Sequence, residues 1–223
     1  MKKQDTESRL ARRSFVGRLW TGVAALSAAA VVAPRAEAQS SGKGTWQPAR
    51  HAADDWLDQV SGRHRFVFDT TKPDGFDWAL RFANNYFNAN NEGYGLEDSD
   101  TAVVIVARHL STAYAFNDVI WSRYGALLAE RMSLEGETPT RNPQNREGNG
   151  ATLPNLIGRG AHLAVCGFAS RGIARSIARS TDGDADVINK EIEDNLVENG
   201  HMMTAGILAV NRAQEHGYSF VSA

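Results

Sequence analysis

The single cysteine of this chain, Cys166, stands where a short apolar run meets a helical pattern. The run 162–166 predicts a buried strand, and Gly167 leads directly into a helix predicted over 170–179. In an open parallel sheet, ligands and reactive groups collect at the carboxyl ends of the strands. A thiol at a helix N-terminus also lies in a positive field, which favours the thiolate. Cys166 is therefore the candidate nucleophile, sulfur carrier or ligand-contacting atom. The alternative is a buried, unreactive cysteine that behaves as a small apolar residue.

Two further candidates follow the apolar run 102–107, which predicts a strand covered on both faces. Arg108 and His109 come at its carboxyl end, so a doubly wound sheet would bring them to the same edge as Cys166. His109 is a candidate acid or base near neutral pH, and Arg108 is a candidate binding residue. The alternative for both is hydrogen bonding within a loop.

Four more residues are assigned to the binding site because they lie at the same edge. Gly167 and Arg171 belong to the start of the helix after Cys166, and Arg171 could meet an anion there. Thr204 is expected to cap the last helix, and His201 is placed beside it with no assigned role. Arg175 and Arg179 continue the arginine stripe, but such a stripe is typical of a solvated helix face.

The sequence predicts neither a metal site nor a bound cofactor. It contains no His-x-x-x-His or Cys-x-x-Cys spacing. Gly158 and Gly160 do not follow a strand, so they form no nucleotide fingerprint. The loop 70–75, where flavodoxins hold flavin phosphate, lacks dense Ser, Thr and Gly. Met202 and Met203 could ligate a soft metal with Cys166, but they are expected to fill the core.

An export signal is predicted over residues 1–38. A basic segment is followed by the apolar run 23–33 and by Ala36-Glu37-Ala38, which has the form of a signal-peptidase site. The segment 12–16 resembles a twin-arginine signal. The run is shorter than the roughly 20 residues that cross a bilayer. We therefore expect cleavage, a periplasmic or otherwise exported protein, and no membrane contact after cleavage.

The charge of the remaining chain argues against nucleic acid as a partner. The chain has 24 basic and 26 acidic side chains, and residues 1–38 hold seven of the basic and three of the acidic ones. The remaining residues therefore carry 17 basic and 23 acidic side chains, a net charge of −6. Binding to a phosphate backbone needs clustered Lys and Arg. One cysteine also excludes an internal disulfide.

Strands alternate with helices through the rest of the chain. This order predicts a three-layer α/β/α sandwich with a mostly parallel, flavodoxin-like sheet of about five strands. Residues 39–63 are expected to form a linker and a short helix, and 64–223 a single domain. The segment 135–154 is predicted to be a long loop, of the kind that serves as a lid, an interface or a disordered segment.

The helix predicted over 76–89 carries a second apolar stripe formed by Trp78, Phe82 and Tyr86. A helix that is apolar on two faces is buried on two faces. The stripe therefore predicts either a homo-oligomer or a cover formed by the N-terminal segment that contains Trp56. The sequence alone leaves both open.

The order of these features resembles the DsrE/DsrF-like sulfur-relay superfamily, across roughly 65–221. The resemblance rests on the strand 100–107, the segment around Val165-Cys166 with Arg171-Gly172-Ile173, and the tail 203–221. Segments 117–121 and 211–216 resemble those of exported members. The resemblance implies a flavodoxin-like sandwich, homo-oligomers and a persulfide-carrying cysteine, which Cys166 matches by position. Export and the long 135–154 segment depart from the relay pattern.

These observations lead to one functional hypothesis and one alternative. The hypothesis is an exported DsrE-like protein that carries sulfur as a persulfide, or binds a small molecule, through Cys166. The alternative is a non-catalytic, oligomeric binding module with a structural cysteine. The sequence does not decide whether a reaction is catalysed, and a soft-metal or flavin protein is a third reading.

Overall fold

The computed structural model describes residues 46–146 and 150–223, and Gln47–Ala223 forms one compact unit. The predicted export signal, residues 1–38, lies outside the described residues. Within the described ranges, none of the helices combines the length and apolar character needed to cross a bilayer.

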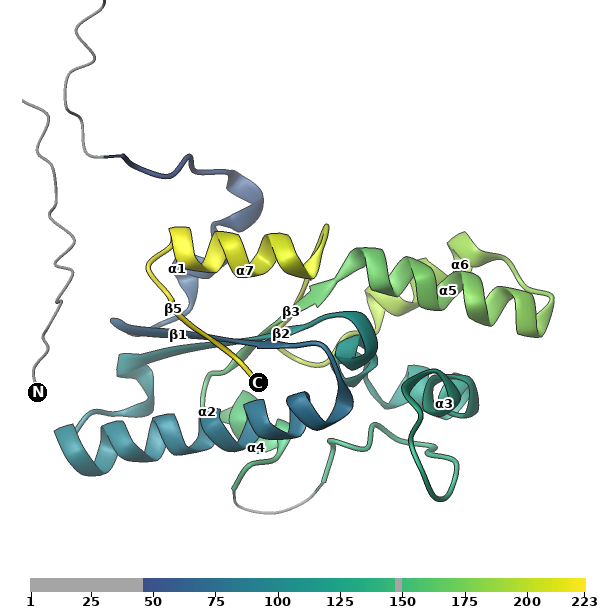
Figure 1. Ribbon diagram of the computed structural model, residues 1–223, viewed down its shortest axis with the longest axis horizontal. Coiled ribbons are helices and arrows are strands. Elements are labelled where there is room, and N and C mark those ends of the chain that lie inside the picture. Colours follow the sequence, from purple (N-terminus) through teal and green to yellow (C-terminus); the bar gives the residue numbers. More distant parts are fainter. Residues whose placement is uncertain (1–45, 147–149) are drawn as a thin grey trace, which may run out of the picture. The chain divides into compact units, whose positions relative to one another are not determined.

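A five-stranded, fully parallel sheet forms the centre of this unit, with the strand order β4-β3-β2-β1-β5 (Figure 1). The central strand β2 is buried along its whole length, as its continuous apolar sequence predicts. The strands are β1 (His64–Thr70), β2 (Thr101–Ala107), β3 (His162–Cys166), β4 (Gly200–Met203) and β5 (Ser219–Ser222).

Helices cover both faces of this sheet and complete the predicted three-layer sandwich. The α-helices are α1 (Trp56–Gln59), α2 (Pro73–Tyr94), α3 (Asp118–Met132), α4 (Leu153–Gly158), α5 (Gly167–Thr181), α6 (Ala185–Asp194) and α7 (Gly206–Glu215). The described residues also form the short 3-10 helices η1 (Ala52–Asp54), η2 (Asp98–Asp100) and η3 (His109–Ala115).

The direction of the connections decides which face each helix covers. From β1 to β4 the chain steps repeatedly to the next strand in one direction, and β5 then returns to the far side of β1. Right-handed crossovers that step in opposite directions place their helices on opposite faces. Accordingly, α2 and α4 lie on one side of the sheet, and α1 and α7 on the other (Figure 1).

Two apolar cores fill the space between the layers. The first contains side chains of α2 to α6 and the side chains of β1, β2 and β3 that alternate toward them, with Trp121 and Phe76 among its largest members. The second is smaller and joins α1 and α7 to the opposite face of β1, β2, β3 and β4.

Several element boundaries differ from the sequence-based prediction. The helix predicted over 76–89 extends over Pro73–Tyr94, because Pro73 occupies the first turn and Gly95 ends the helix in a left-handed conformation. The helix α3 begins only at Asp118, because 109–115 forms the 3-10 helix η3 and Asn117 caps α3. The predicted loop 135–154 ends in the first turn of α4.

Trp56 does not cover the second apolar stripe of α2. Trp56 packs with α7 against one face of the sheet, whereas α2 packs on the other. The sheet therefore separates the two, and this part of the prediction is wrong. Trp78 and Phe82 stack on each other at 5.6 Å and stay 53% and 41% exposed, while Tyr86 packs on Phe66 of β1.

Candidate functional site at the carboxyl edge of the sheet

Cys166 is the last residue of β3 and the N-cap of α5. The chain leaves β3 into α5, which packs with the core on the α2 face, and leaves the neighbouring β4 into α7 on the opposite face. Adjacent strands whose connections diverge in this way leave a crevice at their carboxyl ends. Cys166 thus lies at the point of this sheet where ligand sites occur in open α/β folds.

Four side chains form a row on the α7 face of this edge. The register pairs Ala107 with Val165 and Cys166 with Met203, so Arg108 comes beside Cys166. Asp69 of β1 lies two positions back on the same face, because side chains alternate along a strand. The row Asp69, Arg108, Cys166 and Met203 therefore crosses the sheet beneath the start of α7.

A bidentate ion pair fixes Arg108 within this row. Its Nε and Nη2 each donate to one carboxylate oxygen of Asp69 at 2.7 Å. The Asp69 side chain is only 5% exposed and that of Arg108 26%. The hydrogen bond to Asp69 raises the pKa of Arg108. Arg108 is therefore a fixed positive charge close to the cysteine.

Two glycines allow the chain to close over this row. A Cβ on Gly206 would lie 2.4 Å from Cβ of Arg108, so the first turn of α7 rests directly on the arginine side chain. A Cβ on Gly167 would lie 2.8 Å from the carbonyl oxygen of Met203. The amide of Phe168 also donates to the carbonyl of Thr204 at 3.2 Å, which ties the start of α5 to the end of β4.

The structure brings most of the predicted site residues together. Cys166, Gly167, Arg108 and Thr204 meet where β2, β3 and β4 end. Arg171 joins them from the first turn of α5, because one of its terminal nitrogens lies 3.4 Å from the Cβ position of Gly167. The Arg171 guanidinium stacks over the exposed ring of Phe168, at 5.0 Å.

Two predictions about individual side chains are wrong. Thr204 does not cap α7: the N-cap is Ala205, and no side chain accepts a cap hydrogen bond there. His201 does not lie at the carboxyl edge, because it is the second of the four residues of β4. His109 begins η3 with an exposed side chain and a left-handed backbone, φ 58°.

His201 belongs instead to an aromatic cluster with His162 and Trp56. Its Nε2 lies 2.8 Å from Nδ1 of His162, and its ring stacks on Trp56 at 3.9 Å. Burial, together with the neighbouring His162, lowers the pKa of His201 to about 4. The cluster fastens α1 to the edge of the sheet, so His201 has a structural role here.

We expect the stability of the protein to fall as the pH drops below about 6.5, the pKa of an ordinary histidine. Because the folded-state pKa of His201 is lower, at about 4, protons bind preferentially to the unfolded chain over this interval. The loss should be on the order of 1–2 kcal/mol, allowing for solvent screening at a half-buried ring. Urea unfolding between pH 7 and 4.5 measures it. His201→Gln should flatten the pH profile, whereas exposed His64→Gln should leave it unchanged.

Sequence reasoning missed Asp69 and Gly206 as members of this site. The signal for Asp69 is that it follows the apolar residues 66–68 within the same predicted strand. A charged residue in a buried strand needs a partner, but the sequence does not show which residue that is. Gly206 carries no signal apart from its place before an apolar helix. Both become interpretable only once the register of β1, β2 and β3 is known.

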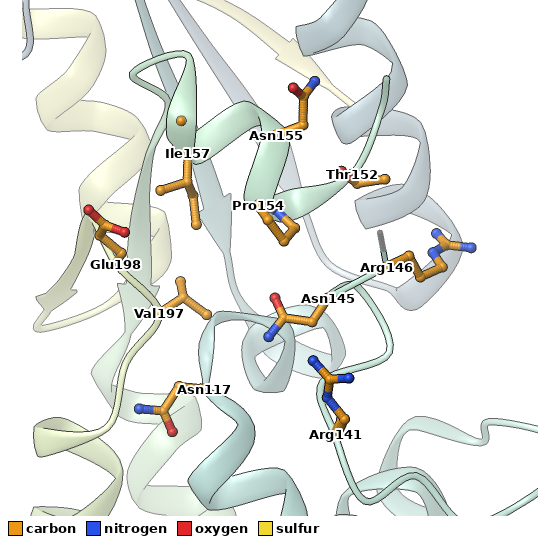
Figure 2. Close-up of a pocket in the computed structure, with 11 residues that line it drawn as sticks. Asn117, Arg141, Asn145, Arg146, Thr152, Pro154, Asn155, Ile157, Val197 and Glu198 are labelled. Carbon is orange, nitrogen blue, oxygen red and sulfur yellow. The ribbon is translucent and has the colours of Figure 1, made fainter. Parts of the chain in front are cut away.

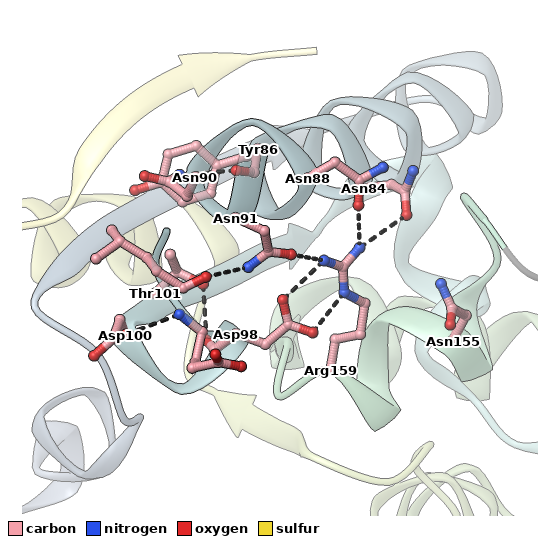
Figure 3. A network of polar contacts seen from close by, with 12 residues as sticks. Asn84, Tyr86, Asn88, Asn90, Asn91, Asp98, Asp100, Thr101, Asn155 and Arg159 are labelled. Carbon is pink, nitrogen blue, oxygen red and sulfur yellow. Dashed lines mark hydrogen bonds and ion pairs between the residues drawn. The ribbon is translucent and has the colours of Figure 1, made fainter. Parts of the chain in front are cut away.

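Arg159, between two glycines, serves as a structural clamp (Figure 3). It donates from Nε and Nη2 to Asp98, at 2.8 Å each, and its other contacts are the amide oxygens of Asn84, Asn88 and Asn91 on α2. These five hydrogen bonds use all five donors of the guanidinium. Arg159 is therefore not available to an anionic ligand.

Two cavities adjoin the elements of the sheet edge and the long loop. One, of about 350 Å³, is lined by Met203, Thr204 and Leu208 and by residues of the segment 51–54. Because Met203 belongs to the row that contains Cys166, this cavity borders that row. The other, of about 530 Å³, lies between the loop before α4, the start of α3 and the segment before β4 (Figure 2). Among the described residues, no group of three or more His, Cys, Asp or Glu side chains could hold a metal ion.

Comparisons with known proteins supply a distant structural likeness. No protein-family model matches the chain, and no curated protein matches it. One solved structure, a protein of unknown function, MTH1491 from Methanobacterium thermoautotrophicum, is similar over 72% of this chain and 100% of its own, at 17% identity and a TM-score of 0.35. These comparisons give this chain neither a family nor a function. Its function is therefore inferred from its own parallel sheet and from the side chains at the carboxyl ends of the strands.

Proposed function

We propose that the protein binds a small thiol-reactive species at Cys166 and carries sulfur there as a persulfide. One observation carries the proposal: the cysteine caps a helix at the crevice between β3 and β4, beside the fixed guanidinium of Arg108. A helix N-terminus and a nearby arginine both favour a thiolate. Because Cys166 is only 8% exposed, the reagent must be small.

The step is a nucleophilic displacement on a polysulfide. The Sγ thiolate attacks a terminal sulfur, a new S–S bond forms, and the adjacent S–S bond of the polysulfide breaks. The shortened polysulfide leaves as an anion, and Cys166 retains one added sulfur with a negative charge. Arg108 stabilises that charge, and Arg171, at the rim, is available to the incoming anion.

The superfamily, the export route and the location of the protein are part of the same proposal. We infer an exported member of the DsrE/DsrF-like superfamily that crosses by the twin-arginine route and works in the periplasm. The parallel five-stranded sheet and the cysteine at the end of its third strand support this assignment. The basic and apolar segments of residues 1–38 support export.

Intact-mass spectrometry after polysulfide treatment tests the function. The folded protein should gain one sulfur, and Cys166→Ser should gain none. Arg171→Ala should slow the transfer severalfold, because it removes the charge at the rim, whereas Arg175→Ala, exposed one turn further along α5, should not. If the thiol reacts in urea but stays inert in the folded protein, the sulfur proposal fails.

A second candidate function is a non-catalytic oligomeric module with a structural cysteine. The stacked, exposed pair Trp78 and Phe82 favours it, since large apolar side chains adjacent on a surface mark association sites. Light scattering should then give a multimer that Phe82→Glu weakens. Val119→Glu, a matched change at an exposed residue of α3, should not weaken it. A monomeric wild-type protein removes this candidate.

A further inference from the structure

The cavity of about 530 Å³ beside the long loop lies on the α2 face of the sheet, away from the Cys166 row. Its volume falls within the range of small-molecule sites. Its lining combines an apolar floor with amides and carries two arginines against one glutamate. The residues used below are Pro154, Ile157, Val197, Asn117, Asn145 and Arg141.

The segment 141–145, which forms one wall of this cavity, is held by buried hydrogen bonds. Asn142 is 2% exposed, and its side-chain amide donates to the carbonyls of Tyr114 and Phe116 at 2.8 Å each. Its own side-chain oxygen accepts from the amide of Gln144 at 2.9 Å. A loop whose conformation is fixed by buried hydrogen bonds loses little entropy when a ligand binds.

Asp118 orients the polar side chains of this wall. Its carboxylate accepts from Nε of Arg141 at 3.0 Å, from the amide of Asn142 at 2.9 Å and from Nδ2 of Asn145 at 2.9 Å. Burial raises the pKa of Asp118, but the hydrogen bonds from Asn142, Arg141 and Asn145 outweigh it and lower the pKa below the usual value. Asp118 is therefore a fixed anchor for both side chains that line the cavity.

This anchoring leaves the terminal nitrogens of Arg141 for a ligand. With Nε of Arg141 committed to Asp118, its two terminal nitrogens have no partner among the described residues. Two parallel N–H groups of a guanidinium match the two oxygens of a carboxylate. Figure 2 shows Arg141 on the loop side of the cavity and Pro154 and Val197 across from it, so apolar side chains line the same cavity as the free guanidinium nitrogens.

We propose that this cavity is a second ligand site, for a small carboxylate with an apolar body, in which Arg141 holds the carboxylate and Pro154, Ile157 and Val197 contact the body. The site is independent of Cys166, because it lies on the other face of the sheet. Asn145, whose Nδ2 donates to Asp118, lines the cavity beside Arg141, and Asn117 closes the end of the cavity at the start of α3.

Benzoate is a suitable probe, because it combines a carboxylate with an apolar ring. In an NMR titration of the full chain, benzoate should shift the backbone amides of Ile157 and Val197 in a saturable way. Benzamide, which has nearly the same shape without the charge, should bind roughly tenfold or more weakly. Arg141→Ala should weaken benzoate binding to a similar extent, whereas Arg123→Ala, an exposed arginine of α3 outside the cavity, should not change it.

The outcomes separate this site from the sulfur proposal. Cys166→Ser should bind benzoate as the wild type does, whatever the polysulfide experiment shows. Equal binding of benzoate and benzamide by the wild-type protein, or shifts confined to other surfaces, would overturn the carboxylate site. The benzamide comparison needs no variant, so it decides the question even if Arg141→Ala folds poorly.

Discussion

Asp69→Ala should lower the free energy of unfolding by about 2–4 kcal/mol, since removing one member of a largely buried ion pair leaves an uncompensated charge. The Asp69 carboxylate is 5% exposed and makes two hydrogen bonds of 2.7 Å to Arg108. Its partner is 26% exposed, so solvent reduces the loss relative to a fully buried pair. Urea unfolding monitored by circular dichroism gives the value.

The double variant Asp69→Ala/Arg108→Ala separates lost attraction from the remaining charge. It should be less destabilised than Asp69→Ala alone, because no guanidinium is left without a partner. Asp194→Ala is the matched control: its carboxylate pairs with Lys190 on the surface of α6, with a side chain 56% exposed. That change should stay within about 0.5 kcal/mol. Similar losses for Asp69→Ala and Asp194→Ala would contradict the role given to the buried pair.

Gly125→Ala and Gly172→Ala should change stability in opposite directions. Both glycines lie in α-helices, where alanine is favoured over glycine by about 1 kcal/mol. At Gly172 a Cβ meets nothing within 4 Å, so Gly172→Ala should stabilise by roughly that amount. At Gly125 a Cβ would lie 1.8 Å from the carbonyl oxygen of Pro139. Gly125→Ala should therefore destabilise by about 1–3 kcal/mol.

Thermal or urea unfolding of the two variants measures this contrast. Gly125→Ala should also weaken benzoate binding, because displacing Pro139 moves the loop that carries Arg141. Gly172→Ala should leave that binding unchanged. Stabilisation by Gly125→Ala would mean that the loop does not press against α3 as described.

The elements that could be predicted from sequence are those specified by local pattern. The apolar run 102–107 predicts a strand covered on both faces, and it forms all but the first residue of β2. The junction at Cys166 was also predictable, because an apolar run, a glycine and a helical period follow one another without a gap. The alternation of strands and helices then restricts the architecture to a parallel layered sheet.

The contacts that could not be predicted join residues far apart in the chain. Asp69 and Arg108 are 39 positions apart, and so are His162 and His201. Each pair depends on strand register, which a single sequence does not specify. Asn142 also contacts residues distant in the chain: its hydrogen bonds to the carbonyls of Tyr114 and Phe116 fix a segment that has no apolar pattern. The prediction for His201 is wrong because β4 continues for two residues beyond it, which closeness to the last helix in the sequence does not show.

The order in which the strands occur has a consequence for biosynthesis. The first turn of α7 covers Arg108, and the strand that follows, β5, pairs with β1, the first strand of this sheet in chain order. A ribosome therefore releases the thiol and its neighbouring arginine before it releases the segment that encloses them. Until α7 and β5 emerge, the nascent polypeptide carries Arg108 without the turn that covers it and β1 with one unpaired edge, so the surroundings of Cys166 are completed only after these two elements have been made.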